Sequence, residues 1–121
     1  MSKVFLNILI AGALFVHGVG HTLGFWMPAR SWLFPHASEK TLRLLSSVFW
    51  VLAAIGFVAA SLGFWGFLVP IEWWSMLAVA SAFISLAGLI IFWGNWPTFN
   101  TIGALAMDIA VLVTQLWLHW P

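Results

Sequence analysis

The chain is 121 residues long, 64% hydrophobic and only 6% charged, with a formal net charge of +1. Soluble globular domains carry about 25% charged residues, so this composition excludes an ordinary soluble domain and indicates an integral membrane protein. The small net charge and the lack of a basic stripe give no reason to expect nucleic acid as a partner. The lack of cysteine excludes disulfides and thiolate metal sites within this sequence.

Long, unbroken apolar runs predict transmembrane helices, because backbone polar groups in a bilayer must be paired within their own segment. Four such runs cover about residues 4–26, 42–67, 73–93 and 99–120. At about 1.5 Å per residue, each is long enough to cross about 30 Å of hydrocarbon. The short links between them predict one all-α domain over residues 1–121, an up-down-up-down four-helix bundle with both termini on one side.

The first run contains two histidines and three glycines between residues 16 and 25. A buried imidazole is costly in a bilayer unless it has a partner, so His17 and His21 indicate a polar site. On a helical projection Asn7 shares their sector, while Gly20 and Gly24 would let a neighbouring helix approach closely. The run imitates a secretory signal peptide, but it is longer than an ordinary one, and we expect it to remain as a membrane span.

The links carry signals for helix ends. Ser38 is a suitable N-cap for the second helix, with Glu39 next to the helix's positive end. Pro70 and Glu72 predict a turn before the third helix. The first link and its neighbouring turn hold three of the four basic residues, so the positive-inside rule predicts a cytoplasmic first link and external termini.

Small and polar side chains form stripes on the third and fourth helices. The third-helix stripe predicts a close helix contact; it consists of Ala78, Ser81, Ser85 and Gly88. The fourth-helix stripe is polar and is too orderly for a lipid-facing surface; it consists of Thr101, Asp108, Gln115 and His119.

Asp108 is the only acidic residue in the middle of a predicted span. A central aspartate costs about 2.5–3.5 kcal/mol on insertion scales, so it should face the bundle interior and be paired. In an antiparallel arrangement its depth matches that of His17 and His21 to within about one or two helical turns. These three residues are therefore the predicted ligand-binding or polar site, with Asn7 and Gln115 as further candidates on the same faces.

Two imidazoles at i and i+4 and one carboxylate also form a sparse ligand set for a divalent metal. His17, His21 and Asp108 are the only candidates, and the H-E-x-x-H motif of metalloproteases is absent. We predict no metal. Haem is disfavoured as well, because histidines one turn apart on one helix cannot occupy opposite axial positions.

The segment from Leu14 to Phe25 resembles the first-helix signature of the DoxX-like membrane proteins, roughly H-G-x-x-K-L-x-G-F. His17, Gly18, Gly24 and Phe25 fit this signature, whereas His21 stands where the family usually has lysine. The resemblance implies a small four-span protein of the bacterial inner membrane. Some members of that family are subunits of a quinone-linked sulfur oxidoreductase or partners of redox enzymes, so the resemblance also implies a role of this kind.

Three functional hypotheses follow. The first is an accessory protein that binds a quinone or another lipid at the His/Asp site and has a membrane redox partner. The second is a membrane enzyme or a proton or ion pathway that uses the same residues, for which a water-lined cavity reaching Asp108 would be expected. The third is a structural homo-oligomer with a dry interior, held together by small residues; these are Gly20, Gly24, Ser81, Ser85 and Gly88. The sequence leaves open whether the protein is catalytic.

Overall fold

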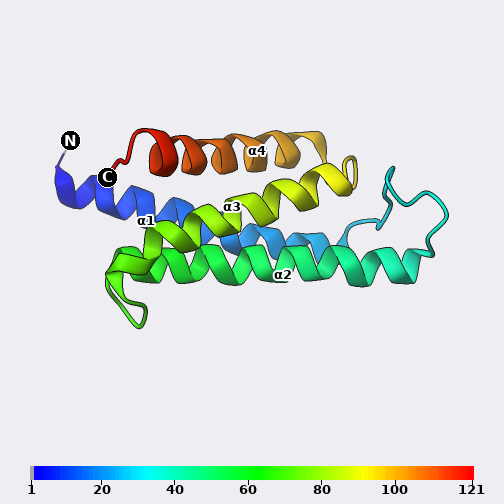
Figure 1. The fold of residues 1–121 in the computed structure, drawn as a ribbon, viewed down its shortest axis with the longest axis horizontal. Helices are drawn as coiled ribbons and strands as arrows, with labels where there is room; N and C mark the ends of the chain where they lie inside the picture. The colour runs from blue at the N-terminus through cyan, green and yellow to red at the C-terminus, as the bar shows by residue number, and fades with distance from the viewer. Residues whose placement is uncertain (1) are drawn as a thin grey trace.

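The computed structural model describes residues 2–121 and contains four long apolar helical segments (Figure 1). The first segment is α1 (Lys3–Gly20), which continues as the 3₁₀ helix η1 (His21–Trp26), and the second is α2 (Glu39–Phe64). The third begins with the short 3₁₀ helix η2 (Ile71–Trp73) and continues as α3 (Trp74–Ile91). The fourth is α4 (Thr98–Leu112), which continues as a π-helical turn, η3 (Val113–Trp117). Each segment has the length and composition of a membrane span. The predicted all-α membrane bundle is confirmed.

The helices pack in chain order, α1 on α2, α2 on α3 and α3 on α4 (Figure 1). Both termini lie at one end of the bundle, together with the link between α2 and α3. The links between α1 and α2 and between α3 and α4 lie at the other end. This is the up-down-up-down arrangement that short links produce.

Serine side chains begin the first two helices. The Ser2 hydroxyl accepts a hydrogen bond from the backbone N–H of Phe5 at 3.1 Å, and the Ser38 hydroxyl accepts one from the N–H of Thr41 at 3.2 Å. The predicted Ser38 cap is confirmed, so α2 begins at Glu39 rather than near residue 42. The helix also ends earlier than predicted, at Phe64, because Gly66 turns the chain with a φ of 69°.

The fourth helix ends earlier than its apolar run. The regular helix stops at Leu112 and widens into the turn that ends at Trp117. The tail folds back, and the Gln115 Nε2 atom donates to the Trp120 carbonyl at 2.7 Å. His119 has a φ of 50° and is exposed, so it leaves the predicted polar stripe.

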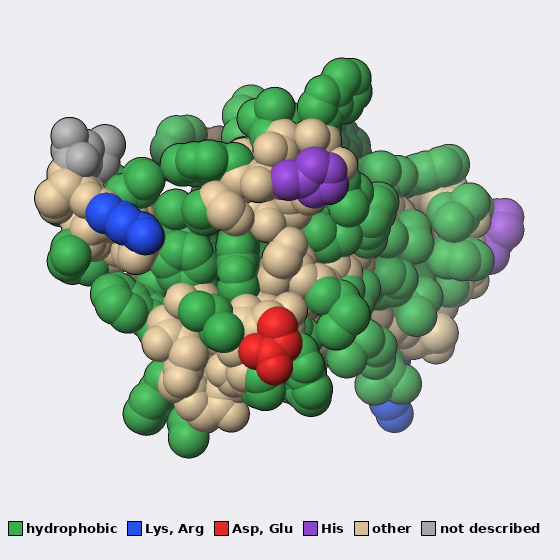
Figure 2. Space-filling view, turned by 60° about the vertical axis from the view of Figure 1, so that its left-hand side comes forward, with side chains coloured by type: hydrophobic (Ala, Val, Ile, Leu, Met, Phe, Trp, Pro, Cys, Tyr) green, Lys and Arg blue, Asp and Glu red, His purple; other side chains and the backbone are tan. Residues whose placement is uncertain are grey.

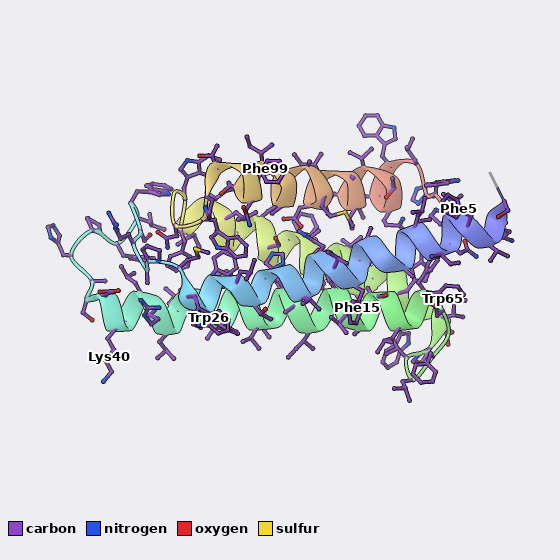
Figure 3. The ribbon with its side chains drawn as sticks, turned by 180° about the vertical axis from the view of Figure 1, so that it is seen from behind. Phe5, Phe15, Trp26, Lys40, Trp65 and Phe99 are labelled. Carbon is purple, nitrogen blue, oxygen red and sulfur yellow. The ribbon has the colours of Figure 1, made fainter. Side chains whose placement is uncertain are left out.

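On the face shown in Figure 2, hydrophobic side chains cover much of the surface, and the charged side chains lie at isolated places. Figure 3 shows Phe15 and Trp26 on the outside of the bundle, with Lys40 near one end and Trp65 near the other. Exposed tryptophans flank the spans, as expected for side chains at the two membrane interfaces; they are Trp26, Trp32, Trp65, Trp73, Trp93, Trp117 and Trp120.

Of the two glycines predicted to make a close helix contact, Gly24 does so and Gly20 does not. A Cβ atom at Gly18 would lie 3.0 Å from the Ala54 carbonyl oxygen and 3.0 Å from the Phe57 Cβ. A Cβ at Gly20 would meet nothing within 4 Å, whereas one at Gly24 would run into the Trp50 indole. Gly18 and Gly24, rather than Gly20 and Gly24, therefore set the approach of α1 and η1 to α2.

Gly18→Val is expected to destabilise the protein by about 1–3 kcal/mol, because the larger side chain must push α1 away from α2. Gly20→Val is the matched control, since it makes the same change two residues later in open space. Unfolding in mixed micelles of a mild detergent and dodecyl sulfate would measure both. Equal losses for the two variants would contradict the assignment of the contact to Gly18.

The third-helix stripe lies inside the bundle. Ser81, Ser85, Ala78 and Gly88 are all buried, and a Cβ at Gly88 would lie 2.9 Å from the Trp50 ring. These small residues therefore make the close contacts within one chain that their spacing predicts.

Candidate functional site

A continuous set of hydrogen bonds connects α1, η1, α3 and α4 in the middle of the bundle. The His17 Nε2 atom lies 2.8 Å from Asp108 Oδ1, and the Ser85 hydroxyl lies 2.5 Å from Asp108 Oδ2. The His21 Nε2 atom lies 2.8 Å from the same Ser85 hydroxyl. The His21 Nδ1 atom lies 2.8 Å from the His17 carbonyl oxygen. We call these four residues the polar network.

The change from α-helix to 3₁₀ helix at His21 positions this histidine. Its backbone N–H bonds to the Gly18 and Val19 carbonyls instead of the His17 carbonyl four residues earlier. Instead, the Nδ1 atom of the His21 ring forms a hydrogen bond with the His17 carbonyl. Because a carbonyl only accepts, Nδ1 must carry a hydrogen, and the other ring nitrogen is left to face Ser85.

The polar network is shielded from the surroundings. Asp108 and Ser85 have no exposed surface, and His21 is 2% exposed. The His17 side chain, at 10%, is the most accessible member. A polar cluster this deep must satisfy its hydrogen bonds internally, and each of the four side chains has a partner.

Aromatic rings surround His21. The centroids of Trp50, Phe57 and Trp96 each lie 5.9 Å from the centroid of its ring. His17 completes the group at 4.7 Å from His21 and 4.5 Å from Phe57. The surroundings of the imidazole are therefore apolar and aromatic, and the stacked Phe57 ring presents a π-face of the kind that can stabilise a cation within about 6 Å.

The structure brings together three of the five predicted site residues. His17, His21 and Asp108 belong to the polar network, and the depth match that suggested their meeting is confirmed. Asn7 and Gln115 do not belong to it. Asn7 is half-buried ten residues before His17, and Gln115 accepts a hydrogen bond from Ser75 at 2.7 Å, about two turns beyond Asp108.

No protein-family model, no curated protein and no solved structure matches the chain. The polar network and the cavities are thus the basis for a functional conclusion.

The sequence did not predict the hydrogen bonds of Ser85 or the aromatic rings around His21. Ser85 belongs to a stripe of small residues, which predicts packing but not its hydrogen bond to Asp108. Trp50 and Trp96 are the two tryptophans with almost no exposure, and sequence position alone separates them poorly from the others. The indole nitrogen of Trp96 is buried without a hydrogen-bond partner among the described residues.

Among residues 2–121, no group of three histidine or acidic side chains is placed to hold a metal ion. His17 and His21 do not point at one shared position, because His21 reaches Asp108 only through the Ser85 hydroxyl. The sparse ligand set considered from the sequence is thus arranged as a hydrogen-bonded chain.

An apolar crevice lies between α1, α3 and α4, next to the polar network and nearer the chain termini. Its volume is about 140 Å³, and it is partly open to the surroundings. Leu14 and Val111 form the deep wall of the crevice. Leu14 lies one turn from His17 on α1, and Val111 lies one turn from Asp108 on α4. Thr114 and Gln115 are the polar residues in its lining; the others are Ile10, Ala13, Trp74, Ala78, Met107, Ala110, Trp120 and Pro121.

Proposed function

We propose that the protein binds a quinone or another lipid in the crevice between α1, α3 and α4, as an accessory component of a membrane redox system. The observation that supports this proposal is the crevice itself, an apolar chamber with an opening and a polar end at Gln115. An apolar chamber that is partly open to the surroundings suits ligands that reside in the bilayer. The zero exposure of Asp108 and Ser85 argues against a water-filled ion pathway through the polar network.

The volume limits what enters the crevice. A closed cavity of about 150 Å³ holds a benzene ring, whereas pockets for whole drug-sized molecules measure about 300–1,000 Å³. A space of about 140 Å³ accommodates one ring or a few carbons of a chain. The rest of the ligand must extend through the opening into the lipid, as a quinone or an acyl chain does.

Gln115 is the group best placed to recognise a ligand oxygen. Its Nε2 atom donates to the Trp120 carbonyl at 2.7 Å, while its Oε1 atom accepts from Ser75 at 2.7 Å. The amide is held in position on both sides and lines the crevice. A ligand carbonyl would take the place of the Trp120 carbonyl, whose segment follows the last helical turn.

The polar network has a supporting role in this proposal. Both nitrogens of His21 and both oxygens of Asp108 are bonded within the chain, so they fix α1, α3 and α4 around the crevice. The redox partner and the bacterial inner membrane come from the resemblance of residues 14–25 to the DoxX-like proteins. His21 in place of the family's lysine removes any contact that depends on an ammonium group.

Ala110→Phe is expected to weaken binding of a short-chain quinone at least tenfold, because the added ring occupies the crevice. Ala106→Phe is the matched control, one turn earlier on the same helix and outside the crevice lining. Titration of the detergent-purified protein, together with mass spectrometry of lipids that remain bound, would measure the effect. Unaltered binding in Ala110→Phe, or no retained or added ligand in the unmodified protein, would overturn the proposal.

A further inference from the structure

The polar network contains four contacts at hydrogen-bonding distance, and each needs one hydrogen between its two atoms. They join His21 Nδ1 to the His17 carbonyl, His21 Nε2 to Ser85, Ser85 to Asp108 Oδ2, and His17 Nε2 to Asp108 Oδ1. Their lengths are 2.8, 2.8, 2.5 and 2.8 Å in that order. Two facing lone pairs at these distances would repel each other.

The side chains in their usual states supply only three hydrogens. A neutral His17 and a neutral His21 carry one N–H each, Ser85 carries one O–H, and an ionised Asp108 carries none. One of the four contacts would then have no hydrogen. The geometry therefore requires one proton more than an ionised carboxylate and two neutral imidazoles provide.

The position of the additional proton follows from the same contacts. The carbonyl of His17 fixes a hydrogen on His21 Nδ1. The count then requires His17 Nε2 to donate to Asp108 Oδ1, because a proton on Oδ1 would put the hydrogen of His17 on its other nitrogen, outside the network. The two contacts of Ser85 share its single O–H, so one of them lacks a hydrogen. A second proton on His17 would sit on its other ring nitrogen, outside the network, and would not fill that gap.

We propose that Asp108, Ser85 and His21 form a buried proton-binding site that holds one proton and passes it between the carboxyl group and the imidazole. In the neutral arrangement Asp108 donates to Ser85, and Ser85 donates to His21 Nε2. In the ionic arrangement His21 Nε2–H donates to Ser85, and Ser85 donates to the Asp108 carboxylate. The same positions of the heavy atoms serve both.

Conversion between the two arrangements moves two protons in the same direction. The Asp108 O–H bond breaks as a new Ser85 O–H forms, and the original Ser85 O–H breaks as the His21 Nε2–H forms. One unit of positive charge thereby moves from α4 to the start of η1, leaving an aspartate anion and a histidine cation. No water or other reactant takes part.

The surroundings fit both arrangements. The network has zero net charge in each, which suits a site without exposed surface in the middle of a membrane bundle. In the ionic arrangement the Phe57 ring, stacked on the imidazole with a centroid distance of 5.9 Å and an interplanar angle of 25°, stabilises the His21 cation through its π-face. The inference depends on the network alone and does not require a ligand in the crevice.

Proton counting in the full-length protein tests the proposal. Nitrogen-15 spectra of the histidine side chains, with the infrared band of a protonated carboxyl assigned by comparison with D108N, give the state of each group. A protonated Asp108 with His21 as the Nδ1–H tautomer, a doubly protonated His21 with ionised Asp108, or a mixture of the two supports the site. An ionised Asp108 with a neutral His21, or a doubly protonated His17, overturns it.

Asp108→Asn provides a second test, because its amide imitates the protonated carboxyl. The amide N–H₂ donates to Ser85 and its oxygen accepts from His17, so all four contacts are filled by neutral groups. D108N should fold and keep His21 as the neutral Nδ1–H tautomer. A cationic His21 in folded D108N, or failure of D108N to fold where D108A folds, would contradict the proposal.

The serine relay is tested by repeating the Asp108→Asn change in two backgrounds. The change should alter the His21 Nε2 resonance when Ser85 is present and leave it unaltered after Ser85→Ala. Ser81→Ala is the matched control, since Ser81 lies one turn away and donates to the Leu77 carbonyl instead. An effect that persists in the Ser85→Ala background would show that the carboxyl reaches His21 without the serine, and would overturn the relay.

Discussion

Asp108→Ala is expected to lower the free energy of unfolding by about 2–4 kcal/mol, among the largest losses for a single substitution in this chain. The carboxyl group has no exposed surface and is hydrogen-bonded to His17 and Ser85 at 2.8 and 2.5 Å. Each interhelical bond in a membrane contributes about 1 kcal/mol, and the alanine leaves both partners unpaired in an apolar interior. Reversible unfolding in mixed micelles would measure the loss.

Ile109→Ala is the control for this prediction. Ile109 is the next residue on α4 and is 52% exposed, so its replacement should change the free energy of unfolding by no more than about 0.5 kcal/mol. Asp108→Asn should lie near the unmodified protein, because the amide retains both contacts. If Asp108→Ala were as stable as Ile109→Ala, the polar network would contribute nothing to the association of α1, α3 and α4.

The parts of this structure that follow from local periodicity were predictable. Apolar runs of about 20 residues give the four spans, and the known rise of a helix places Asp108 at the level of His17 and His21 before any contact is known. The Ser38 cap follows from the chemistry of one side chain. These predictions need only the sequence along one helix, or a depth in the bilayer.

The other features of the structure depend on the rotation of each helix about its axis and on where a helix changes from α to 3₁₀ or π geometry. The 3₁₀ turn at His21 frees the His17 carbonyl and redirects the imidazole toward Ser85, and nothing in the spacing of the two histidines predicts this change. Ser85 has the same small-residue signature as Ser81, but only Ser85 faces Asp108. The early end of α4 was likewise not predictable, because the apolar run continues through the π-helical turn where the regular helix has already ended.

The same rotation of the helices that forms the polar network also places aromatic rings around His21. Trp50 on α2 lies between two glycines, because a Cβ at either Gly24 or Gly88 would run into its indole. The ring is 1% exposed and lies 5.3 Å from Trp96. It therefore connects η1, α2 and α3 at the level of His21.

Trp50→Ala is accordingly expected to destabilise the protein by about 3 kcal/mol and to change the environment of His21. Buried tryptophan-to-alanine changes cost about 3–5 kcal/mol in soluble cores, and the lost van der Waals contacts count in a bilayer as well, where lipid does not fill the void. Trp26→Ala, at a side chain 76% exposed, should cost far less. Unfolding in mixed micelles measures the stability, and the His21 nitrogen resonances report the site. If these resonances were unaltered in folded Trp50→Ala, the indole would not form part of the wall around the imidazole.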